Sequence, residues 1–176
     1  MIASRTEERA TLREGGKRLA QILGEIIEEV RPGLSTLALD RLAERLIVSA
    51  GGQPAFKGYR THAGERPFPA SICASLNDEV VHAIPRADRI LDEGDILGLD
   101  IGMSWPSKIQ NSTAGLITDM AMTVAVGKIS PQAEKLIRVT REALEIGIKV
   151  LRSGIRMGDL GHAIEKHIEE HDFGVI

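Results

Sequence analysis

The sequence predicts an α+β fold in which an antiparallel sheet is covered by helices. Apolar residues recur with helical spacing in two regions, 19–50 and 131–172, and short segments rich in Val, Ile and Met lie between them. The connections between these segments are short. Antiparallel strands can be joined by tight turns, whereas parallel strands need long crossovers. The order therefore favours an antiparallel sheet over a doubly wound parallel one.

Composition and charge narrow the class of protein. The 176 residues are 43% hydrophobic and 27% charged, the usual balance of a globular domain. A net charge of −3 provides no broad basic surface for nucleic acid or anionic membrane. The single cysteine, Cys73, excludes an internal disulfide and favours a reducing compartment. With neither an apolar signal segment nor a run of membrane-spanning length in the sequence, we expect a cytoplasmic protein.

Two helices are predicted in the N-terminal region. The first covers residues 19–30, where apolar side chains form one stripe, and ends at Arg31-Pro32-Gly33. The second begins near Ser35 or Thr36 and ends at Gly51-Gly52, because glycine readily takes the positive φ of a helix end.

Extended segments follow these helices. We expect a loop over 53–70 with a short extended piece near Ala55–Tyr59. Four strands are then predicted, bounded by Pro85, Gly94, Pro106 and Gly127, and they cover residues 71–76, 79–84, 95–103 and 117–126.

Two more helices are predicted after the strands. Ser130-Pro131 begins the first, which ends at Ser153-Gly154. Asp159 is expected to cap the second, which closes at Phe173-Gly174. The following Val175-Ile176 is typical of the start of a strand, so we expect the native protein to continue beyond this sequence.

Two aspartates form the most informative pattern. Alternation places Asp100 among small residues on one face of its strand, with Leu97, Leu99, Ile101 and Met103 on the other. Asp119 likewise shares a face with Ala121 and Thr123. If the two strands form a hairpin, the carboxylates lie close together, repel each other and require a divalent cation. From the pattern alone, a structural or surface role for both remains an equal alternative.

His82 is the third candidate. It is predicted on the strand 79–84 between apolar neighbours. Taken alone, such a histidine is more often a structural residue than a functional one.

Three segments together resemble the type I methionine aminopeptidases. They are FPASICASLNDEVVHAIP at 68–85, LDEGDILGLDIGM at 91–103 and TDMAMTVAVG at 118–127. The resemblance extends over nearly the whole chain. It implies the pita-bread fold, two αβ halves related by approximate symmetry around a metal site, with residues 1–176 as the N-terminal portion of a single catalytic domain.

The resemblance also implies an activity and its cofactors. The activity is removal of the initiator methionine from nascent polypeptides, and the cofactors are two divalent ions, chosen from Co, Mn, Fe and Zn. By matching position, Asp100 chelates one ion, Asp119 bridges both, and His82 lies beside the scissile amide outside the metal shell. Phe68 and Cys73 match positions that line the pocket for the methionine side chain.

Two departures from the family pattern follow. The loop at 104–117 is longer than in the common bacterial form and is expected to change the rim of the site. Trp105 in this loop is a candidate contact for substrate or the ribosome, or an exposed residue without a role. The family's metal-binding His, two metal-binding Glu and second active-site His belong to a region that would follow Ile176. We therefore expect this chain to be inactive alone, and the complete protein to be a monomer.

The sequence disfavours three alternatives to a methionine aminopeptidase. A non-catalytic pita-bread relative that binds protein or nucleic acid does not explain why His82, Asp100 and Asp119 occur together. A proline-specific or creatinase-like member is disfavoured by the short N-terminal region and by the segment 68–85. The segment His167–His171 matches the H-x-x-E-H zinc-protease pattern. Since no third ligand follows it, we interpret its histidines as helix-end residues.

Overall fold

The computed structural model describes residues 5–107 and 115–176, and half of the predicted loop 104–117 therefore lies outside the described residues. The chain forms two compact units, Met1–Lys128 and Ile129–Ile176, which are described separately. Within the described residues, no helix is long and apolar enough to cross a lipid bilayer.

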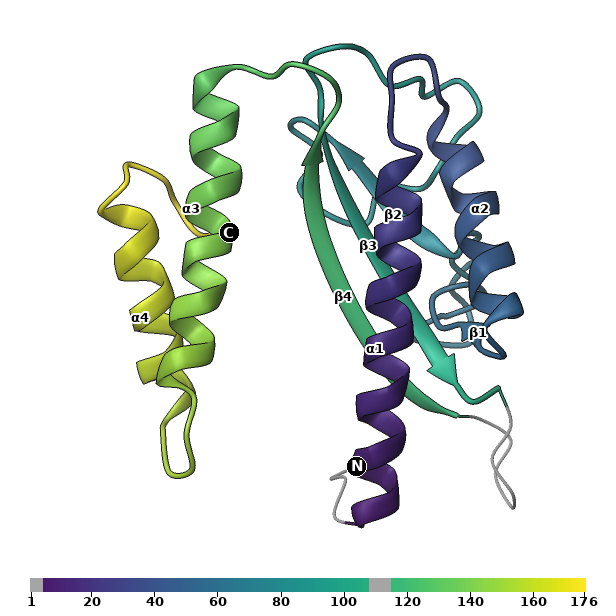
Figure 1. The fold of residues 1–176 in the computed structure, drawn as a ribbon, viewed down its shortest axis with the longest axis horizontal. Coiled ribbons are helices and arrows are strands. Elements are labelled where there is room, and N and C mark those ends of the chain that lie inside the picture. The colour runs from purple at the N-terminus through teal and green to yellow at the C-terminus, as the bar shows by residue number, and fades with distance from the viewer. Residues whose placement is uncertain (1–4, 108–114) are drawn as a thin grey trace. The chain divides into compact units, whose positions relative to one another are not determined.

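The first unit is built on an antiparallel sheet, as predicted (Figure 1). Its strands are β1 (Gln53–Pro54), β2 (Ile72–Leu76), β3 (Ile96–Trp105) and β4 (Leu116–Ala125). β3 is central, because β4 pairs with it along its whole length while β1 and β2 share its other edge.

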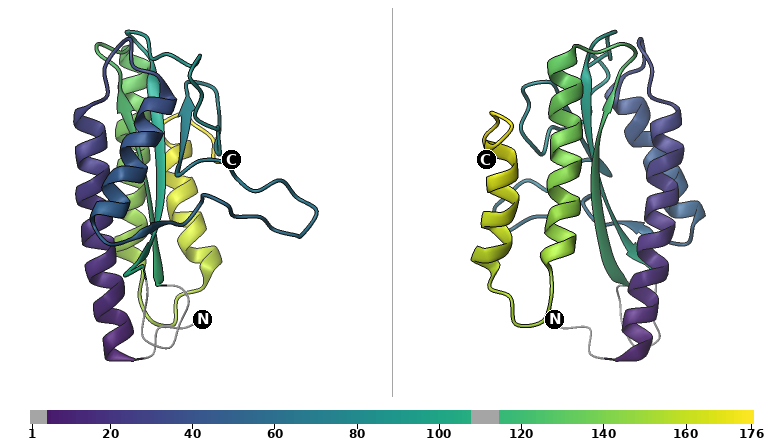
Figure 2. Two further views of the ribbon diagram at one scale, coloured as in Figure 1. Left: turned by 90° about the vertical axis from the view of Figure 1, so that its right-hand side faces the viewer. Right: turned by 60° about the vertical axis from the view of Figure 1, so that its left-hand side comes forward.

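Two helices cover one face of this sheet (Figure 2). They are α1 (Thr6–Glu28) and α2 (Thr36–Ser49). α2 begins where predicted, because the Ser35 hydroxyl accepts a hydrogen bond from the Ala38 amide at 3.2 Å. α1 begins at Thr6 rather than at residue 19. Its first turns are polar but contain good helix formers, and Glu8 accepts hydrogen bonds from the Arg5 amide and side chain.

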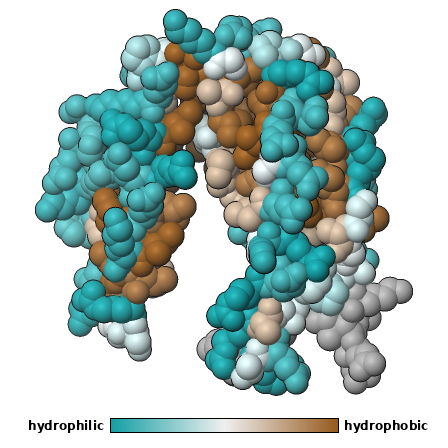
Figure 3. Space-filling model, in the orientation of Figure 1, coloured by the Kyte–Doolittle hydropathy of each residue, from teal (hydrophilic) through white to brown (hydrophobic). Residues whose placement is uncertain are grey.

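The core lies between these helices and the sheet. Leu97, Leu99 and Ile101 on β3 are at most 1% exposed, as the predicted alternation requires. They pack against apolar residues of both helices, among them Leu19, Leu23, Ile26, Leu39 and Ile47. Figure 3 shows the same division: the outer side of α1 is mostly hydrophilic, and hydrophobic surface lies beside it. The opposite face of β3 is therefore free to carry polar groups.

The buried Asp40 joins α2 to the start of β2. Its carboxylate accepts hydrogen bonds from the backbone amides of Ser71 (2.7 Å) and Ile72 (3.2 Å). Burial raises the pKa of this carboxyl above its usual value, and the two hydrogen bonds oppose that rise. Asp40 therefore fixes the strand that carries Cys73.

Replacing Asp40 by alanine is expected to lower the free energy of unfolding by about 2 kcal/mol, because two buried amides lose their acceptor. Urea titration followed by the fluorescence of Trp105, the single tryptophan, measures this change in the first unit. The control is Asp88→Ala, which removes an exposed ion pair with Arg86 and should cost less than about 1 kcal/mol. Equal losses in both variants would contradict the assigned role of Asp40.

The predicted strand at 79–84 is wrong. After β2 the chain turns at Asn77, which has a positive φ, and the Glu79 carboxylate closes the turn by accepting from the Leu76 amide at 2.8 Å. The segment that follows is irregular and leaves Val80 and Val81 exposed. A short apolar run resembles a strand in sequence, but here a local side-chain hydrogen bond stabilises a turn instead.

Trp105 does not lie in an exposed loop. It ends β3, half-buried, and its indole N–H donates to the Ala50 carbonyl at 3.1 Å. The Arg18 guanidinium lies over its ring, 4.7 Å from the centroid. Trp105 thus stabilises the packing of α1 and α2 on the sheet, and the expectation of an exposed residue is corrected.

The second unit is a pair of packed helices, α3 (Pro131–Val150) and α4 (Met157–Glu169). The Ser130 hydroxyl caps α3 as predicted by accepting from the Ala133 amide at 3.2 Å. α4 begins before Asp159, so this residue is not the cap itself. Its carboxylate instead accepts from the amide of the capping residue, Arg156, at 3.3 Å.

Candidate metal centre

The two predicted aspartates lie on the same face of the sheet. Asp100 pairs with Ala121 and Asp119 pairs with Gly102, so the two carboxylates are diagonal neighbours on β3 and β4. Diagonal positions in an antiparallel pair are within reach of a shared small ligand. The strand register therefore brings together Asp100 and Asp119, whose proximity the sequence could only suggest.

The electrostatic surroundings of both carboxyls oppose ionisation. Burial raises the pKa of Asp100, and the negative charge of Asp119 raises it further. Partial desolvation also raises the pKa of Asp119, although that residue is exposed overall. Within the described part of the chain, neither carboxylate forms a hydrogen bond or an ion pair. A divalent cation would supply the missing positive charge, so the pair fits a metal ion.

His82 is the third residue of the site. It is exposed, and its left-handed φ of 60° is uncommon for a residue other than glycine. A positive charge on its imidazole lowers the pKa of Asp100, although burial and the charge of Asp119 have the larger, opposite effect. The loop that contains His82 is attached to β2 by a backbone hydrogen bond, in which the Ala74 amide donates to the Ala83 carbonyl at 3.0 Å.

Cys73 continues the row of side chains across the sheet. It pairs with Asp100 on β2 and is buried. Burial and the charges of the two aspartates raise the pKa of its thiol to about 12. The thiol is therefore protonated at neutral pH and acts as a small apolar group.

Phe68 belongs to the loop that precedes β2. It is half-buried, and its backbone bonds to two other loop residues: its amide donates to the Tyr59 carbonyl and its carbonyl accepts from the Gly58 amide, both at 2.8 Å. These bonds hold Phe68 in the segment leading to Cys73.

A further aromatic residue borders the site, which sequence analysis missed. The ring of Phe56 packs over Gly102, where a Cβ atom would come within 2.6 Å of the ring. Since Gly102 is the partner of Asp119, Phe56 lies next to the carboxylate face. The sequence feature that could have indicated this contact is Gly102, because a glycine in a strand leaves room for a bulky neighbour.

Comparison with known proteins agrees with this geometry. Residues 10–176 match the model of metallopeptidase family M24. A methionine aminopeptidase of Clostridium acetobutylicum is 40% identical over 165 residues, 94% of this chain and 60% of that protein. One from Helicobacter pylori is 41% identical over 95% of this chain and 60% of its own length. The chain spans 60 to 65% of the length of such relatives.

Solved structures extend the comparison. The crystal structure of methionine aminopeptidase from Thermotoga maritima is 32% identical, with a TM-score of 0.88, and the match covers all of this chain and 65% of that one. A prolidase from Pyrococcus horikoshii, 15% identical with a TM-score of 0.78, shows likeness of fold alone. The predicted pita-bread α+β fold is confirmed by these likenesses. With a family model matched over residues 10–176 and a carboxylate pair that fits a metal ion, this chain belongs to metallopeptidase family M24.

Proposed function

We propose that the protein is a methionine aminopeptidase that removes the initiator methionine from nascent polypeptides. The observation that carries this proposal is the diagonal placement of Asp100 and Asp119 on one face of the sheet, together with an electrostatic interaction between Asp100 and His82. The names of the relatives support the same substrate. A non-catalytic relative has no need of such a pair.

The aspartates would hold the metal. Membership in a metallopeptidase family implies a divalent cofactor. We propose that Asp100 and Asp119 would together hold two ions, drawn from Co, Mn, Fe and Zn. Bound divalent ions polarise the scissile carbonyl and activate the attacking water.

The other site residues would orient the substrate and move a proton. The exposed His82 can reach solvent and donate a proton to the departing amide nitrogen. Phe68 and Cys73 would line the pocket for the methionine side chain. The protonated Cys73 thiol suits that pocket, because a neutral sulfur packs against a thioether without an unpaired charge.

The substrate also places the protein in the cell. Nascent chains emerge in the cytoplasm, so we propose that the protein acts there. It would act as a monomer, with the ribosome as the partner that presents the substrate. The low net charge of −3 agrees with a partner bound through the nascent chain rather than through nucleic acid.

The test is methionine release from the peptide Met-Ala-Ser by the protein encoded by the whole gene. We expect release that EDTA abolishes and added Mn²⁺, Co²⁺, Fe²⁺ or Zn²⁺ restores, because the carboxylate pair needs its cation. The 176-residue chain alone is expected to release none, since it spans 60 to 65% of the relatives' length. Release that persists in EDTA, or cleavage of X-Pro peptides in preference to Met-Ala-Ser, would contradict the proposal.

A further inference from the structure

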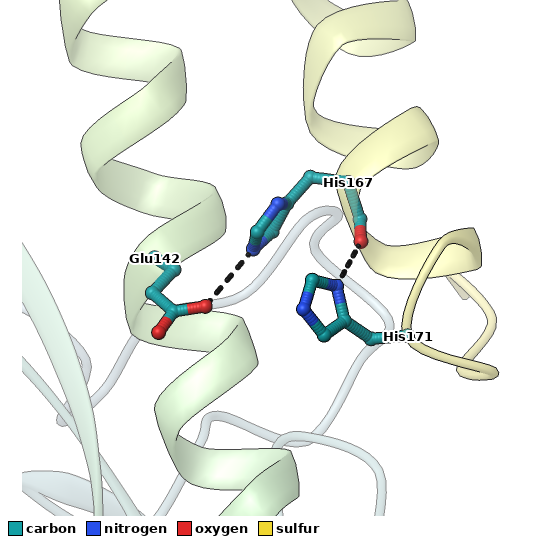
Figure 4. A group of neighbouring side chains, drawn as sticks. All are labelled: Glu142, His167 and His171. Carbon is teal, nitrogen blue, oxygen red and sulfur yellow. Dashed lines mark hydrogen bonds and ion pairs between the residues drawn. The ribbon is translucent and has the colours of Figure 1, made fainter.

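The second unit contains another group of metal-binding side chains, far from the aspartates in sequence. Glu142 on α3 and His167 on α4 face each other, with Glu142 Oε2 3.2 Å from His167 Nε2 (Figure 4). His171, just after α4, lies beside them. One ligand atom from each of these three residues lies within 4.8 Å of the others.

The packing of the two helices positions this group. Gly147 allows close approach, because a Cβ atom there would already lie 3.1 Å from the Ile164 side chain. Lys135 on α3 holds the far end of α4, donating to the His171 carbonyl at 2.7 Å. The ligands are thus presented by two elements held together at several points, as a metal site requires.

Two of the ligand atoms are hydrogen-bonded to each other, since His167 Nε2 donates to Glu142 Oε2, and a bound zinc ion would replace the proton on that nitrogen. His171 Nδ1 donates to the His167 carbonyl at 2.8 Å, so its Nε2 carries the lone pair. Metal-binding histidines commonly make such a bond with the other ring nitrogen. Glu142 uses Oε1 for Arg138, at 2.8 Å, which leaves Oε2 on the side of His167.

We propose that Glu142, His167 and His171 bind a zinc ion that links α3 to α4. Two imidazole nitrogens and one carboxylate oxygen form a three-ligand zinc set, with the fourth position open to water. Atoms around one tetrahedral zinc lie about 3.3 Å apart, close to the 3.2 Å already present between His167 and Glu142. The three ligand atoms lie within 4.8 Å of one another, so His171 would have to move closer to complete the set.

This inference differs from the sequence-based interpretation of the same histidines. That interpretation looked for a third ligand after His171, as in inverted zinc proteases. The structure places the third ligand before them, on α3, and Glu170 of the motif takes no part in the group. The proposed site does not involve Asp100 or Asp119 and does not depend on the proposed function.

The competing interpretation is a plain hydrogen bond between His167 and Glu142 with no metal. Lys135 and Arg138 carry positive charge near the group, and this charge disfavours a bound cation. The two imidazole nitrogens and the carboxylate oxygen are suitable zinc ligands and favour one.

The test uses the 176-residue chain, without a histidine tag, carrying Asp100→Asn and Asp119→Asn so that the first site cannot compete. Calorimetric titration with ZnCl₂ is expected to show one zinc per chain with a dissociation constant of about 1 μM or lower. Adding His171→Gln or Glu142→Gln should weaken binding at least tenfold, roughly the loss caused by removing even an outer partner of a metal site. The matched control is His162→Gln, since His162 lies exposed on the same helix outside the group, and zinc affinity should not change.

Two measurements keep the result decisive. Circular dichroism checks that the helices remain folded in each variant. His171→Gln is the preferred variant because residue 171 lies after the end of α4, so the substitution does not alter a helical position. Titration with Co²⁺ should give the visible absorption of a tetrahedral site in the parent and lose it in His171→Gln. Absence of zinc binding in the folded parent, or equal affinity in His171→Gln, Glu142→Gln and the parent, would overturn the proposal.

Discussion

Replacing Asp119 by asparagine in the complete protein is expected to lower kcat/KM for Met-Ala-Ser at least about a thousandfold, equivalent to about 4 kcal/mol of transition-state stabilisation. Asparagine keeps the size of the side chain but removes the negative charge that would hold the metal. Asp119 is exposed on β4, so the fold should not change. The rate of methionine release and the affinity for Mn²⁺, measured by calorimetry, should therefore fall together, while the midpoint of urea unfolding should not change.

The matched control for this variant is Asp92→Asn. Asp92 is exposed just before β3 and lies outside the carboxylate face, so its loss should leave both activity and metal binding unchanged. Normal methionine release by Asp119→Asn would remove Asp119 from the metal site.

Replacing Ile101 by alanine is expected to lower the free energy of unfolding of the first unit by about 3 kcal/mol. Ile101 is fully buried in the core that β3 shares with the helices, and truncation leaves a cavity there. Urea titration followed by Trp105 fluorescence measures the loss. Because Ile101 lies between Asp100 and Gly102 in the chain, the variant should also bind metal more weakly as the strand loosens.

Ile117→Ala provides the control. Ile117 lies on β4, 61% exposed, so the same truncation removes few contacts and should cost less than about 0.5 kcal/mol. Similar losses at Ile101 and Ile117 would show that the described core does not determine the stability of this unit.

Local patterns predicted much of the fold, and they failed in two places, one decided by a local side-chain hydrogen bond and one by a long-range contact. Alternation identified the buried face of β3 correctly, and Ser35 and Ser130 marked two helix starts. The strand expected at 79–84 is an irregular segment, because a turn stabilised by Glu79 precedes it. Trp105, expected in an exposed loop, bonds to Ala50, which lies far away in sequence.

The candidate site shows the same division. The aspartates were identified by residue type and by their small neighbours, but their proximity depended on a register that alternation cannot specify. Phe56 was missed because its contact with Gly102 joins distant parts of the chain. The metal-binding roles of Asp100 and Asp119 remain predictions, as do the substrate-binding roles of His82, Phe68 and Cys73.

The sequence by itself determined the α+β class, the alternation of buried and polar positions in β3 and β4, and the choice of Asp100 and Asp119 as candidate metal ligands. It could do so because period-two patterning and helix caps are local properties. The tertiary structure alone decided which residues meet. Strand register made Asp100 and Asp119 diagonal neighbours, and helix packing placed Glu142 against His167. The physical reason is that both arrangements depend on contacts between residues far apart in the chain, and the free energy of those contacts appears only when the core is packed.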